Sequence, residues 1–127
     1  MKYLLDTHAL IWFLEDDKQL PIAVKNIICS DEADIYLSIA SFWEMAIKIA
    51  RGKLKLSQPL ECLLDTLENQ SIALLPIQPA HILKLLELPF EHNDPFDLLM
   101  IAQCLQDEIA FISNEELFLR YGVNRVW

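Results

Sequence analysis

Four acidic residues have types and positions that could do metal chemistry. Asp6 follows a strand-like run directly, Glu44 lies in the helical segment after the next strand, and Asp94 and Asp97 stand at the head of a strongly apolar helical segment. Clustered carboxylates raise one another's pKa unless a cation neutralises them. If these acids converge, a divalent ion is the economical neutraliser. Oxygen ligands favour Mg²⁺, with Mn²⁺ as an alternative, over zinc.

A metal held by carboxylates in this way is suited to phosphodiester hydrolysis. It lowers the pKa of a bound water, orients that water and stabilises the charge that builds on the phosphate. The acids therefore indicate nuclease chemistry, provided that they do meet.

Three of the four acids also have a purely structural interpretation. Asp6 and Asp94 each fit a helix N-cap, which stabilises by about 1 kcal/mol. Glu44 follows Ser41 by three residues, the spacing of a capping box. The i,i+4 pair of Glu44 with Lys48 also fits a solvated helix face. Taken singly, these residues leave the choice between structure and function open.

Asp97 is different because it heads an apolar stripe. One helical face carries Asp97 together with Ile101, Cys104 and Leu105. A carboxylate turned toward a core is costly unless it is paired or binds a cation. Asp97 is therefore the acid whose position most favours a functional role.

The elements that must position these acids alternate along the chain. Strands are expected at 2–5, 34–38, 72–75, 109–112 and 123–127, and helices at 7–14, 21–30, 41–52, 59–69, 79–86, 94–107 and 115–120. This alternation predicts an α/β sandwich, a mostly parallel sheet with helices on both faces, in one domain spanning 1–127. Functional groups gather at the carboxyl ends of such strands. We therefore expect Asp6, Glu44 and the residues after the 109–112 strand at one edge.

Composition limits the classes of function. The chain has 127 residues, 54% of them hydrophobic, and a net charge of −9, which disfavours a simple electrostatic binder of nucleic acid. It has neither an apolar run long enough for a membrane helix nor a leader-like start, so we expect a cytoplasmic protein. The three cysteines, Cys29, Cys62 and Cys104, have no metal spacing and are expected to be buried small hydrophobes.

Other candidate residues are weaker. The three histidines, His8, His81 and His92, share no metal-ligand spacing, although His8 stands two residues from Asp6. The basic residues Lys48, Arg51, Lys53 and Lys55 could grip an RNA backbone or stabilise a helix C-terminus. The sequence has no Gly-rich phosphate loop and no recognisable spacing for nucleophilic catalysis.

Three sequence blocks resemble PIN-domain proteins of the VapC toxin type. They are LLDTH at 4–8, SIASFWEMAIK at 38–48 with GKL at 52–54, and HNDPFD at 92–97 followed by IAQ at 101–103. The similarity runs over essentially the whole chain. It implies a PIN-like three-layer α/β/α sandwich.

The resemblance also implies a function. Such a protein is an Mg²⁺-dependent endoribonuclease, the toxin of a toxin–antitoxin pair, which cuts RNA until a small VapB-like antitoxin occupies it, and it commonly forms a homodimer. By motif match, Asp6, Glu44 and Asp97 are the catalytic acids that hold the metal. Asp94 matches a further acid that could be a ligand, an outer-sphere group or only the cap.

The sequence departs from the family pattern at two positions. The fourth acid of the family, usually Asp in a Ser/Thr-x-Asp pattern, is replaced in Ser113-Asn114-Glu115 by Glu115. Leu98 stands where relatives often carry a basic residue. These departures keep open a catalytically weak interaction module. A receiver-type signalling domain is a further alternative, but the sequence lacks its central phospho-accepting Asp and its late Lys.

Overall fold

The computed structural model describes residues 1–89 and 94–127, and His92 and Asn93, the first two residues of the third sequence block, lie outside them. The strands are β1 (Lys2–Leu5), β2 (Asp34–Ser38), β3 (Ile72–Leu75), β4 (Ala110–Ile112) and β5 (Arg125–Val126). The α-helices are α1 (Thr7–Leu14), α2 (Ile22–Ile28), α3 (Ile39–Ala50), α4 (Leu63–Asn69), α5 (Pro79–Lys84) and α6 (Pro95–Asp107). Short 3-10 helices are η1 (Leu60–Cys62), η2 (Leu85–Glu87) and η3 (Glu116–Tyr121).

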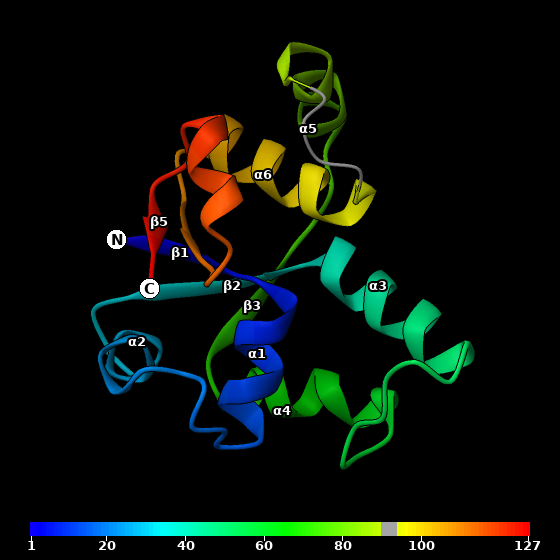
Figure 1. The fold of residues 1–127 in the computed structure, drawn as a ribbon. Helices are drawn as coiled ribbons and strands as arrows, with labels where there is room; N and C mark the ends of the chain where they lie inside the picture. The colour runs from blue at the N-terminus through cyan, green and yellow to red at the C-terminus, as the bar shows by residue number, and fades with distance from the viewer. Residues whose placement is uncertain (90–93) are drawn as a thin grey trace.

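In the described residues the strands form one five-stranded sheet with the order β3-β2-β1-β4-β5, and every pairing is parallel. Helices cover both faces, so the expected three-layer α/β/α sandwich is confirmed (Figure 1). From β1 the chain crosses outward to β2 and β3, and it then returns to β4 on the other side of β1. The sheet therefore has a topological switch point between β1 and β4, where ligands bind in open α/β sheets.

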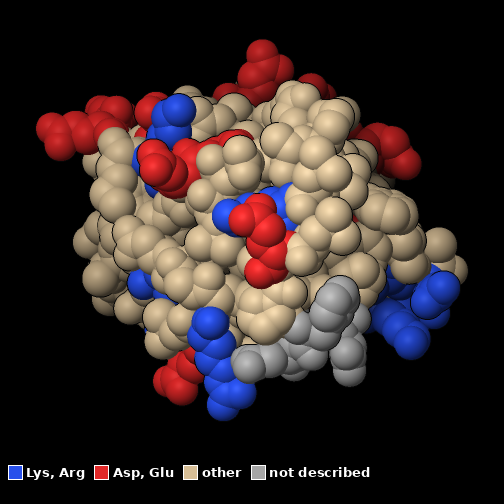
Figure 2. Space-filling model, turned by 90° about the horizontal axis from the view of Figure 1, so that it is seen from above, with Lys and Arg blue, Asp and Glu red and all other residues tan. Residues whose placement is uncertain are grey.

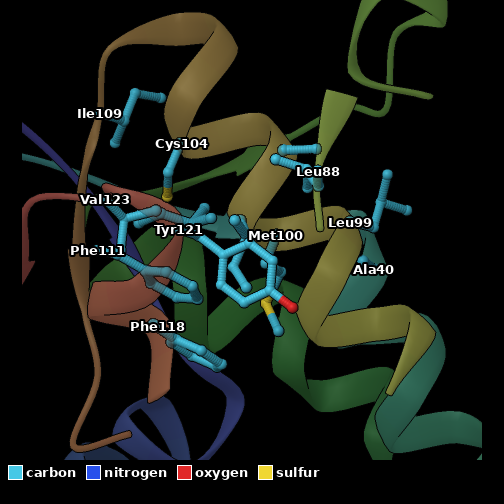
Figure 3. Packing of buried hydrophobic residues seen from close by; sticks show 13 residues of the cluster. Ala40, Leu88, Leu99, Met100, Cys104, Ile109, Phe111, Phe118, Tyr121 and Val123 are labelled. Carbon is cyan, nitrogen blue, oxygen red and sulfur yellow. The ribbon is translucent and has the colours of Figure 1, made fainter. Parts of the chain in front are cut away.

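Side chains alternate between the two faces of the sheet and so build two cores. Leu4 and Phe111 face α6 and η3, and Phe111 stacks on Phe118 with ring centroids 5.0 Å apart (Figure 3). Leu5 and Ile112 face the opposite side, against α1, α2 and α4. Both faces are buried, as a parallel sheet requires. The ends of β1 and β4 are consequently held in place by packing on both faces of the sheet.

Some boundaries differ from the sequence expectations. The helix expected to open at Ser41 begins at Ile39, because Ser38 ends β2 and caps α3 by accepting a hydrogen bond from the Ala40 amide at 2.9 Å. The capping-box interpretation of Glu44 is therefore wrong, since Ser41 lies inside the helix. Cys29 and Cys62 are exposed rather than buried, because they lie at the end of α2 and in η1.

α5 is attached to α6 through a buried histidine. His81 Nδ1 accepts from the Gln78 amide at 2.9 Å, and His81 Nε2 lies 2.9 Å from Asp107 Oδ2. On the outside, Ile82, Leu83 and Leu86 are exposed. The view from above in Figure 2 shows mostly uncharged residues, with acidic and basic side chains side by side near the centre and at the upper left and most other charged side chains toward the rim. No helix within the described residues is long and apolar enough to cross a membrane.

Candidate functional site

The switch point of the sheet brings Asp6 and Ser113 together from neighbouring strand ends. Ser113 Oγ donates to Asp6 Oδ2 at 2.8 Å, and the Thr7 amide donates to Asp6 Oδ1 at 2.8 Å. The Asp6 amide in turn donates to the Ile112 carbonyl at 2.9 Å. The Asp6 carboxylate is therefore fixed on both oxygens, and the expectation that β1 and β4 end at one edge is confirmed.

Burial dominates the electrostatics of Asp6. Loss of hydration raises the pKa of Asp6 above its ordinary value, and the nearby Glu44 carboxylate adds to the rise. The hydrogen bonds from Ser113 and Thr7 and the charge of His8 oppose it. This carboxylate therefore lies where a cation would stabilise its ionised form.

Glu44 lies in a closed polar network between α1 and α3. Its side chain is almost wholly buried, with only 3% of the residue exposed. Glu44 Oε1 lies 2.7 Å from the Thr7 hydroxyl, and Glu44 Oε2 lies 2.9 Å from Lys48 Nζ. The Thr7 hydroxyl also lies 2.9 Å from Ser41 Oγ. The Glu44–Lys48 pair expected on a solvated face is thus present, but its acidic end is buried.

Lys48 is the cation that the chain itself places among the acids. Its hydrogen bond and charge interaction with Glu44 raise the pKa of Lys48, and the charges of Asp94 and Asp97 raise it further, against the effect of partial burial. Glu44 on α3, the α6 N-cap Asp94 and Asp97 in the first turn of α6 therefore all favour the charged form of one ammonium group. Packing of α3 against α6 accounts for the proximity of these groups.

The N-terminus of α6 presents the other two acids. Asp94 is the N-cap: its Oδ1 accepts from the Phe96 amide at 2.9 Å and from the Asp97 amide at 3.3 Å. The structural interpretation of Asp94 is thus confirmed, and a role as ligand stays a prediction. Asp97 lies in the first turn and is partly buried, at the head of the stripe formed by the buried Ile101 and Cys104.

The candidate ligands fit a hard divalent cation in kind, since they are carboxylate oxygens. As the side chains stand, no three His, Cys, Asp or Glu residues of the described part of the chain form a group that could hold a metal ion. The ammonium group of Lys48 already pairs with Glu44 Oε2, one of the candidate ligand oxygens. Glu115 is exposed, and its amide donates to Ser113 Oγ at 3.1 Å.

Sequence reasoning missed the hydroxyl groups that hold the acids. Thr7, Ser41 and Ser113 are all buried, and each contacts an acid or another member of the network. The available signal was position, because Thr7 and Ser113 directly follow Asp6 and the β4 strand. A small polar residue at a buried strand end is itself a sign of a polar network.

Fold and site together define an α/β domain with an acidic corner at its switch point. A family model described as PIN domain matches residues 3–124. The chain therefore belongs to the PIN domain family. A search of curated protein sequences finds no match.

Solved structures show the same fold at low sequence identity. One similar chain comes from the crystal structure of VapBC2 from Rickettsia felis bound to a DNA fragment from their promoter, with 16% identity and a TM-score of 0.74 over 99% of this chain and 98% of that one. Another comes from the structure of FitAB bound to an IR36 DNA fragment, with 19% identity and a TM-score of 0.68 over 98% of this chain and 93% of that one.

Proposed function

We propose that this protein is a divalent-metal-dependent endoribonuclease and the toxin of a VapBC-type toxin–antitoxin pair. The observation that supports the proposal is the electrostatic coupling of the acids within a PIN domain: Glu44 acts on Asp6, and Glu44, Asp94 and Asp97 all act on Lys48. Membership of the PIN family also removes the receiver-type alternative.

Asp6, Glu44 and Asp97 are the residues that would hold Mg²⁺ or Mn²⁺, with Asp94 as a further ligand or outer-sphere group. When bound, the metal supplies Lewis acidity for the phosphodiester and lowers the pKa of the attacking water. The donor set agrees with this chemistry because it consists of carboxylate oxygens.

The chain's own residues fix these acids before any ligand arrives. Ser113 and the Thr7 amide orient Asp6, while the Thr7 hydroxyl and Lys48 orient Glu44. Preorganised groups in a partly dry site stabilise developing charge without a cost of reorganisation at the moment of reaction. Burial of Glu44 and Thr7 also keeps bulk water out of this side of the site.

The proposed partners follow from charge and surface. RNA is the substrate, and a small VapB-like antitoxin is the inhibitor; a basic antitoxin segment would be steered by the net charge of −9. The exposed apolar residues Ile82, Leu83 and Leu86 of α5 and η2 suit a homodimer interface. The two solved structures named above are of VapBC2 and FitAB, each bound to a DNA fragment.

The test is cleavage of a panel of tRNA, ribosomal RNA fragments and mRNA by purified protein. Cleavage in Mg²⁺ should disappear in EDTA and fall at least about 100-fold in Asp6→Asn, since loss of even an outer-shell group of a metal site costs about 10–100-fold. Asp34→Asn, an exposed aspartate at the start of β2, is the matched control and should cleave normally.

The other outcomes of this experiment have definite meanings. Cleavage that survives in Asp6→Asn would contradict the site assignment. A folded protein that neither cleaves RNA nor binds Mn²⁺ would leave the interaction module as the function of this PIN domain.

A further inference from the structure

A second feature lies beside Asp6, in a cavity that Glu44 does not line. A cavity of about 180 Å³ is lined by Asp6, His8, Trp12, Asn114, Glu115 and Trp127. The ring centroids of His8 and Trp12 lie 5.9 Å apart, as do those of Trp12 and Trp127. Residues from the start and the end of the chain thus form an aromatic wall next to the acidic site.

Core packing anchors two of the three rings of the aromatic wall. Trp12 and Trp127 are partly buried and pack against the core formed by α1, α2 and α4. The loop opposite is also held, because Arg125 Nη2 donates to the Asn114 carbonyl at 3.1 Å. The interplanar angles are 44° for His8–Trp12 and 59° for Trp12–Trp127, so a flat ligand would find separate, tilted ring faces on which to stack.

The polar groups of the cavity indicate which part of an RNA could enter. Glu115 lines the cavity and repels a phosphate, so an unpaired base is the part that enters while its phosphate stays outside. Unpaired bases stack on Trp and His rings and hydrogen bond along their edges. A carboxylate such as that of Glu115 accepts hydrogen bonds from an exocyclic amino group, which adenine, cytosine and guanine have; uracil offers only its ring N3–H, flanked by two carbonyl oxygens that repel the carboxylate.

We propose that this cavity is a nucleobase subsite that takes an unpaired, amino-bearing base of the RNA next to the position of cleavage. The inference rests on the proposed ribonuclease function and adds a source of sequence preference to it. His8, Trp12 and Trp127 provide the stacking surface, and Glu115 and Asn114 provide the edge that distinguishes bases.

The tryptophans themselves report on this subsite. The chain has three tryptophans, and Trp43 lies elsewhere, against Phe96. In Trp43→Phe protein, the remaining fluorescence comes from the two cavity tryptophans. Titration with hexa-adenylate, hexacytidylate and hexauridylate, in EDTA and at high salt to screen the net charge, should show quenching by the first two and much weaker quenching by the third.

Two further substitutions sharpen the test. His8→Ala removes an exposed ring without threatening the fold, and it should weaken hexa-adenylate binding about fivefold or more, as the loss of a base stack does. Glu115→Gln can donate as well as accept, so it should bring hexauridylate binding up toward that of hexa-adenylate. A circular dichroism melt of each variant checks folding.

The results separate this proposal from the proposed function. Equal binding of all three oligonucleotides, no quenching, or stronger quenching by an arginine-rich peptide would overturn the subsite. Base-selective quenching by a protein that shows no metal-dependent cleavage would retain the subsite and refute the nuclease.

Discussion

The two sides of Asp6 are built in opposite ways. On one side Glu44 is buried and bonded to Thr7 and Lys48 within a closed network. On the other side Glu115 is exposed at the mouth of a cavity. The comparison teaches that one site can combine a charge held in a fixed place with a charge left available to a ligand.

The difference has a simple origin in the chain path. Glu44 lies in the second turn of α3, which packs against α6, so its carboxylate must be satisfied by protein groups. Glu115 lies in the short connection from β4 to η3, on the surface. Helix packing therefore fixes one acid, and loop exposure leaves the other adjustable.

The largest expected effect on stability comes from Thr7→Val, which removes a hydrogen bond from the closed Glu44 network. The substitution keeps the shape of the side chain but leaves the buried Glu44 Oε1 without its hydroxyl donor. Hydrogen bonds to charged groups contribute about 1.5–3 kcal/mol, so we expect unfolding in urea with EDTA to show a loss of about 2 kcal/mol.

Thr66→Val is the matched control for this substitution. The Thr66 hydroxyl donates to the Cys62 carbonyl at 3.0 Å on the helix surface, so its loss should be close to neutral. Equal losses of stability in the two variants would mean that the Thr7–Glu44 hydrogen bond contributes no more than the surface hydrogen bond of Thr66.

Lys48→Met should have the next largest effect. Breaking a fully buried ion pair costs about 3–5 kcal/mol, but 38% of the Lys48 side chain is exposed, so we expect a loss of about 1–2 kcal/mol in EDTA. Saturating Mg²⁺ or Mn²⁺ should restore part of this loss, because a second cation can then neutralise Glu44. The measurement is urea unfolding with and without metal.

Lys25→Met is the control for Lys48→Met. It breaks the exposed Lys25–Asp16 pair, 2.6 Å long, and should change neither stability nor its metal dependence. A Lys48→Met protein that responds to metal no more than wild type would show that Lys48 and the metal do not share Glu44.

A smaller effect, opposite in sign, is expected for Asp6→Asn without metal. Burial raises the pKa of Asp6 in the folded protein above the ordinary value of 3.8. The folded protein therefore loses stability as pH rises from 3.8 to the raised pKa of Asp6, and below pH 3.8 this loss is absent. Asp6→Asn should therefore unfold at a higher temperature than wild type in EDTA at neutral pH. The gain should vanish as pH falls toward 3.8.

Thermal melts of wild type, Asp6→Asn and the exposed Asp34→Asn over this pH range check the prediction. Mg²⁺ should stabilise wild type and leave Asp6→Asn unchanged. A stabilisation of Asp6→Asn that is independent of pH would contradict the pKa of Asp6 as its cause.

Much of the fold could be predicted from the sequence, because the parallel strands are short apolar runs between helices with clear starts. Asp94 with Pro95 marked the start of α6 correctly. The start of α3 was misplaced because Ser38 and Ser41 both fit a cap, and only the end of β2 decides between them. Local patterns predict elements well, but they do not decide between neighbouring caps.

The candidate site was less accessible to sequence reasoning. The acids could be identified as residues after strands and by motif, but their partners depend on helix packing. Lys48 could be paired with Glu44 from the i,i+4 spacing, whereas its proximity to Asp94 and Asp97 arises from the contact of α3 with α6. The contact of Trp12 with Trp127 joins the two ends of the chain, and no local pattern predicts it.

The smallest effect on stability is expected for Glu115→Gln. Its effect on RNA cleavage decides whether Glu115, on the open side, is separate from the metal ligands. The side chain is exposed, so the free energy of unfolding should stay within about 0.5 kcal/mol of wild type. If Glu115 only contacts the base, the maximal rate of RNA cleavage should change less than about tenfold while the base preference changes. If Glu115 instead replaces the fourth acid of the family, the rate and the affinity for Mn²⁺ should fall together, by about 10–100-fold or more. That second result would place Glu115 with Asp6 and Glu44 as a metal ligand. An exposed acid would then belong to the metal site as much as a buried one does, and the division between a closed and an open side would fail.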